Sequence, residues 1–114
     1  MSGQSLNFDA CTSYFGDSHV VMLAALQQML EVLPQDWVAL KADLDAGRYH
    51  QAAIIAHRLA GTLAMVGADS MSSECRSLSL QLDDNQPVDR RQVLSVEAGI
   101  MGVMAQIHTY LRQQ

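Results

Sequence analysis

The sequence is poor in positively charged residues. Its 114 residues include seven Lys or Arg, of which only Lys41 is a lysine, against twelve Asp or Glu, so the net charge is −5 with histidine neutral. Nucleic-acid binding depends on clustered basic side chains, and this class is therefore excluded. No glycine-rich phosphate-binding loop occurs either, which argues against an ATP-dependent enzyme.

Cysteine and long apolar runs are also scarce. Cys11 and Cys75 are the two cysteines, and neither belongs to a CxxC pair. A structural zinc site is therefore unsupported. An oxidised pair stays open from the sequence, and we expect buried free thiols in a reducing compartment. The first fifteen residues have neither the charge nor the apolar run of a secretory signal, and no apolar window reaches about 18 residues. We therefore expect a cytoplasmic protein without membrane insertion.

Ala, Leu, Met and Gln dominate the composition, and this favours helix. No segment alternates with period two, so no strand is predicted. Asp9 could cap a short helix over residues 10–15. Apolar spacings of three and four then predict a helix from 19 to 33, which Pro34 ends or kinks, and its stripe continues to 47. Further helices are predicted over about 48–66, 70–82 and 89–112.

Four substantial helices with short joins predict an all-α protein, an antiparallel four-helix bundle with a short extra N-terminal helix. We expect residues 1–114 to form a single domain. Residues 1–16 would be an arm or linker that includes the short helix, and residues 17–114 the bundle. Several side chains are expected in the core, namely Val20, Met22, Met29, Met101 and Met104.

The predicted helix over residues 48–66 carries an unusual outward face. At about 100° per residue, one apolar arc must face the core: Ala52, Ile55, Ala56, Leu59, Thr62, Leu63 and Val66. His57 then points to solvent. Its neighbours on the outer face are His50, Ala53, Ile54, Ala60, Gly61 and Ala64. Such a surface normally carries charged side chains, so we interpret it as a docking patch around an exposed nucleophilic imidazole. Gly61 would let another backbone or a phosphoryl group approach closely.

The segment Ala56–Gly67 resembles the signature of histidine phosphotransfer (Hpt) domains of bacterial multistep phosphorelays. Their pattern is His-x-Leu-Lys-Gly, a second glycine six residues later, and then Leu, Cys and Leu at helical spacing. The matching positions are His57, Leu59, Gly61, Gly67, Cys75 and Leu78, with Met71 in place of the first of these leucines. The resemblance extends over most of the chain and implies a four-helix bundle with one exposed, phosphorylatable histidine.

The sequence departs from the family pattern at Ala60, where these domains usually carry a lysine near the phosphoryl group. Arg58 is adjacent to His57 but lies about 100° around the helix. Arg76, or Arg90 and Arg91, could replace the lysine from a neighbouring helix, and the sequence does not place them.

The resemblance implies a phosphorelay intermediate. His57 would accept a phosphoryl group from an aspartate of a receiver domain and pass it to another receiver, because neutral imidazole is nucleophilic near neutral pH. The chain would be a phosphoryl carrier, not an enzyme with an ATP site. No cofactor or metal is expected on it, since the receiver brings Mg²⁺. The expected partners are response-regulator receivers, including those of a hybrid sensor kinase, and the expected state is a monomer.

Other functions are also open at this stage. The missing lysine at Ala60 favours an Hpt-like module that binds receivers without carrying phosphate. A homodimer seam could use Ala53, Ile54, Ala60 and Ala64. A metal-binding or enzymatic bundle would need Glu-x-x-His pairs, and none of the three glutamates is followed by histidine at that spacing.

Overall fold

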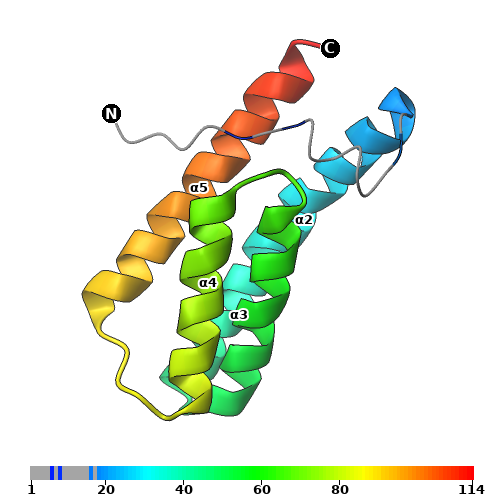
Figure 1. Cartoon of the computed structure of the whole chain (residues 1–114). Helices are drawn as coiled ribbons and strands as arrows, with labels where there is room; N and C mark the ends of the chain where they lie inside the picture. Colours follow the sequence, from blue (N-terminus) through cyan, green and yellow to red (C-terminus); the bar gives the residue numbers. More distant parts are fainter. Residues whose placement is uncertain (1–5, 7, 9–15, 17) are drawn as a thin grey trace.

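The structure, a computed structural model of the whole chain, describes residues 6, 8, 16 and 18–114. Its described part holds four helices and no strand: α2 (His19–Asp45), α3 (Tyr49–Ala64), α4 (Asp69–Asp83) and α5 (Arg90–Arg112) (Figure 1). The predicted all-α bundle is confirmed. The short helix expected over residues 10–15, with Asp9 as its cap, falls outside the described residues.

Side-chain caps and glycines delimit several of the helices. Ser18 caps α2 and Asp89 caps α5, each accepting a hydrogen bond from a backbone N–H of the first turn. Gly47 and Gly67 follow α2 and α3 with φ of 75° and 72°. This left-handed conformation is one that glycine adopts without the steric cost that a Cβ imposes.

α2 is one helix of 27 residues that passes through Pro34. The expected continuation of its stripe is confirmed, and Pro34 does not end the helix. A proline removes one backbone donor from the helix ladder. Leu33 and Trp37, on either side of it, are only 1% and 5% exposed, so the burial of this stripe stabilises helical backbone on both sides of the proline.

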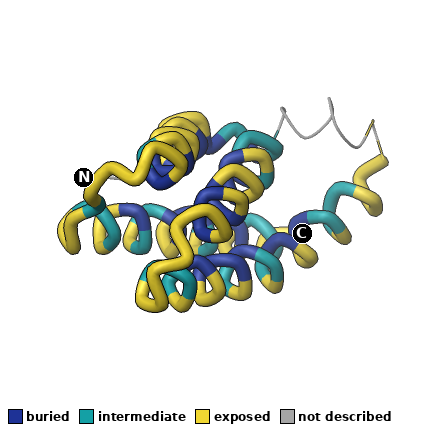
Figure 2. The backbone as a smooth tube through the Cα atoms, turned by 90° about the horizontal axis from the view of Figure 1, so that it is seen from below, coloured by how far each residue is buried: buried dark blue, intermediate teal, exposed yellow. Residues whose placement is uncertain are grey.

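The core lies between the helices, and the buried positions of each turn inward (Figure 2). The predicted stripe of α4 is buried in full: Met71, Cys75, Leu78 and Leu82. Two expected core residues are exposed instead. Val20 is 76% exposed because the N-terminal end of α2 extends beyond α3 (Figure 1), and Met101 is 64% exposed on the outward side of α5.

Polar contacts connect α5 to the rest of the chain. One carboxylate oxygen of Glu97 accepts hydrogen bonds from Lys41 Nζ at 2.8 Å and from Trp37 Nε1 at 2.7 Å. These donors lower the pKa of Glu97. Near the other end of α5, the Phe8 ring stacks on Tyr110 with centroids 4.3 Å apart. Within the described residues, none of the helices has the length and apolar character needed for a membrane span.

Candidate functional site

His57 lies in the middle of α3, on the side of the helix turned away from the core, and it is exposed as predicted. Ala56 and Leu59, one and two positions away, are fully buried and fix the rotation of α3 about its axis. The imidazole makes no hydrogen bond or ion pair with any described residue. The helix therefore presents an unpartnered nucleophile at a fixed position.

Only part of the predicted patch around His57 reaches the surface. Ile54 is 52% exposed, Gly61 is exposed and Ala64 is half-buried. Ala53 and Ala60 are each 1% exposed. Their predicted place on the outer face is therefore wrong, and neither can belong to an exposed homodimer seam.

The cause of this burial is α4, which packs against the flank of α3 that carries the two alanines. The hydroxyl of Ser79 donates to the carbonyl oxygen of Ala53, and that of Ser72 to the carbonyl oxygen of Ala60, both at 2.8 Å. Small side chains permit this close approach. Because α2 also packs against α3, the buried arc of α3 is wider than a single core stripe.

Gly61 has no packing role among the residues that the structure describes. A Cβ built at this position would meet no heavy atom within 4 Å, apart from the helix's own backbone. A mid-helix glycine costs about 1 kcal/mol relative to alanine, and the chain's own contacts do not explain this cost. The open space above Gly61, one turn after His57, is consistent with close approach of an external group.

Arg58 is hydrogen-bonded to a residue of α2, on the side of the site that faces that helix. Its guanidinium donates two hydrogen bonds to Asp36, from Nη2 at 2.9 Å and from Nε at 3.1 Å. The hydrogen bond to Asp36 raises the pKa of Arg58. Although Arg58 is adjacent to His57 in sequence, its charged group is held by a carboxylate of α2.

On the α4 side, His50 Nδ1 lies 3.1 Å from Asp83 Oδ1. Sequence reasoning missed this contact. It also missed Asp36 and the two serines of α4. Spacing along one helix carries no information on the register between helices, so no sequence signal could have identified these partners.

Other parts of the described structure offer no competing centre. Within residues 6, 8, 16 and 18–114, no three His, Cys, Asp or Glu side chains gather where they could hold a metal ion. A hollow of about 640 Å³ lies between α2, α5 and the loop after α4, beside Pro87 and Arg90. It does not include His57.

The bundle thus presents, in the middle of α3, an imidazole that has no partner among the described residues. The sequence model of the Hpt domain family matches residues 24–113, which cover nearly all of α2 to α5, and the chain belongs to this family. No curated protein and no solved structure matches it significantly. Hpt domains serve phosphotransfer in two-component signalling. They act as phosphocarriers without an ATP site, and they interact with receiver domains.

Proposed function

We propose that His57 is the phosphoryl-accepting residue of a phosphorelay intermediate. It takes a phosphoryl group from an aspartyl phosphate of one receiver domain and passes it to the aspartate of another. The observation that carries this proposal is the exposed imidazole, which has no partner among the described residues and lies one turn before the open space above Gly61.

The transfer requires little of this chain beyond holding the imidazole of His57 in position. The lone pair of one ring nitrogen of His57 attacks phosphorus in line, and an N–P bond forms. The P–O bond to the receiver aspartate breaks, and its electron pair returns to the carboxylate. Such transfers have a loose transition state, so catalysis rests on alignment and charge stabilisation. Mg²⁺ belongs to the receiver in this scheme, and the chain itself binds no cofactor.

The surface around His57 suits a docking partner. Ile54 provides an exposed apolar contact on one side of the imidazole. A shallow, mainly apolar hollow of about 210 Å³ lies between α2 and α3, with Met29, Val32 and Thr62 in its lining. A receiver that covered Ile54 and this hollow would exclude water around His57. We propose this α2–α3 surface as the receiver-docking face.

Intact mass measurement after incubation with a phosphorylated receiver and Mg²⁺ tests the proposal. We expect an acid-labile gain of one phosphoryl group, which disappears in His57→Gln. His50→Gln is the matched control, since it removes an exposed imidazole from the same helix and should leave the gain intact. A gain that persists in His57→Gln would contradict the assignment.

The alternative is a module that binds receivers without accepting phosphate, and Ala60 is the feature that favours it. Measurable receiver binding with no mass gain for several receivers would support this alternative.

Several further predictions accompany the proposed function: a single domain over residues 1–114, a monomer that meets its partners in turn, and a cytoplasmic location shared with receivers, including those of hybrid sensor kinases. Light scattering with and without receiver tests the monomer.

A further inference from the structure

The contacts between α3 and α4, here called the α3–α4 seam, repeat at intervals of seven residues. The hydrogen bonds from Ser79 to Ala53 and from Ser72 to Ala60 are both 2.8 Å, and they are seven residues apart on each helix. Seven residues make nearly two turns, about 10.5 Å along the axis. A contact across the seam is therefore expected to recur in a similar place after seven positions on both helices.

His50 and Asp83 meet across the outer edge of this seam, with Nδ1 and Oδ1 3.1 Å apart. Seven positions forward on α3 is His57, and seven positions back on α4 is Arg76. Because the helices are antiparallel, the two steps run in the same direction along the seam. The repeat therefore predicts that Arg76 lies opposite His57 as Asp83 lies opposite His50.

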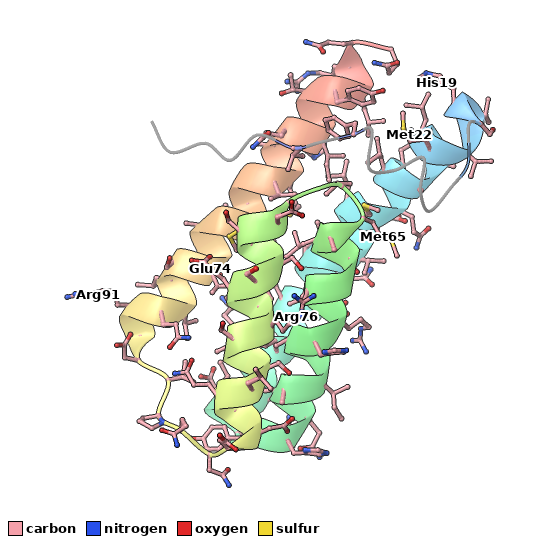
Figure 3. All side chains as sticks on the ribbon, viewed as in Figure 1. His19, Met22, Met65, Glu74, Arg76 and Arg91 are labelled. Atoms are coloured by element: carbon pink, nitrogen blue, oxygen red, sulfur yellow. The ribbon has the colours of Figure 1, made fainter. Side chains whose placement is uncertain are left out.

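The side chain of Arg76 is exposed and extends from α4 over the seam toward α3 (Figure 3). An arginine side chain is longer than that of aspartate, so its guanidinium reaches farther across the seam than the Asp83 carboxylate does. Arg76 makes no hydrogen bond or ion pair with any described residue. Glu74, also on α4, points toward α5 instead and lines a hollow with Gln92 (Figure 3).

The other candidate cations are bound to carboxylates or lie away from His57. Asp36 holds Arg58, and Glu97 holds Lys41 at 2.8 Å. Arg90 lies beside the loop after α4, at the far end of the bundle. Arg91 projects from α5 away from the α3–α4 seam (Figure 3). Arg76 is thus the guanidinium in the described structure that is both unpaired and opposite His57.

We propose that Arg76 binds and neutralises the phosphoryl group on His57. The proposal rests on the proposed function of His57 as the acceptor. A phosphoryl group carries about two negative charges, and a guanidinium offers a planar fork of donors that matches its oxygens. The cation that the family usually supplies from the position of Ala60 is supplied here from α4.

Chemical phosphorylation with phosphoramidate tests this without any receiver. An N–P bond forms on the imidazole, the P–N bond of the reagent breaks, and ammonia leaves with the proton it gains. Peptide mapping gives the ratio of phospho-His57 to phospho-His50. We expect Arg76→Gln to lower this ratio on the order of threefold to tenfold and Arg76→Lys to recover part of it. Arg91→Gln, the matched control, should leave it unchanged.

The same variants are then compared in transfer from a phosphorylated receiver. An unchanged ratio in Arg76→Gln, or no phosphoryl group on His57 at all, would overturn the role of Arg76. If that ratio is unchanged while the wild-type chain still accepts phosphate from the receiver, the carrier function of His57 is retained and only the role of Arg76 is rejected. A ratio that depends on Arg76, with no transfer from any receiver, would retain the Arg76 site and reject the relay function.

Discussion

Asp36 of α2 binds Arg58 of α3 through two hydrogen bonds, at 2.9 and 3.1 Å, and the two side chains differ in exposure. The Asp36 side chain is 13% exposed, whereas that of Arg58 is 54% exposed. This ion pair covers the side of α3 that faces α2, directly beside His57. His57, the proposed phosphoryl acceptor, thus has a bound guanidinium on one flank, and in our proposal Arg76, which has no partner among the described residues, lies on the other.

The difference in exposure predicts unequal costs of removing each partner. Arg58→Ala leaves a largely buried carboxylate unpaired and should lower the free energy of unfolding by about 1–3 kcal/mol. Asp36→Ala leaves a guanidinium that water can solvate, so it should cost less. Urea denaturation of both single variants and the double variant measures this. Equal costs, or the reverse order, would show that the exposure of the partner left behind does not determine the cost of breaking this pair.

Replacing Gly61 should raise the stability of the fold and slow phosphoryl transfer. Gly61→Ala places a Cβ in open space, so the free energy of unfolding should rise by up to about 1 kcal/mol. Transfer from a receiver should nevertheless slow, because the added methyl group occupies the surface that the partner approaches. Thermal unfolding and transfer kinetics are measured on the same preparation.

Gly102 provides the matched control for this variant. It also lies within a helix, α5, and an added Cβ there meets nothing within 4 Å. Gly102→Ala should bring a similar gain in stability with unchanged transfer. If Gly61→Ala also leaves transfer unchanged, the surface above Gly61 is not where receivers dock.

Helical periodicity was sufficient to predict the inward stripe of α4, that of α3 except for Thr62, which is half-buried between α2 and α3, and the exposure of His57. It did not predict the burial of Ala53 and Ala60. A hydrophobic stripe identifies the face that points to the core, but small residues beside it can be covered by a neighbouring helix without adding to the stripe. The partners of His50 and Arg58 depend on the register between helices, which periodicity along one helix does not encode.

Ala60→Lys tests whether the family lysine can be restored. Because Ala60 is 1% exposed beneath Ser72, a lysine stem must displace α4 or bend outward before its ammonium reaches water. We expect a loss of about 1–3 kcal/mol in the free energy of unfolding, typical of overpacking. Gly61→Lys, at the adjacent open position, is the control and should cost less. A fully stable Ala60→Lys would mean that the α3–α4 seam accommodates a long side chain without strain.

Cys75 should make stability fall at alkaline pH. The thiol is 0% exposed in the core, and burial raises its pKa to about 12. In the unfolded chain the pKa of a cysteine is about 8.5. Below that pH both states keep the proton and the stabilisation is complete. As pH rises further, the unfolded state loses its proton first, so the stabilisation declines until the pH passes the folded pKa.

Comparison with Cys75→Ala isolates this effect from other groups that titrate at high pH. Between pH 7 and about 9.5, the wild-type chain should lose on the order of 1 kcal/mol more unfolding free energy than the variant. With Cys11 replaced by serine, a thiol reagent should react with Cys75 only at the rate at which the core opens. Equal pH dependence of the two chains, together with rapid labelling in native buffer, would place the Cys75 thiol in contact with solvent.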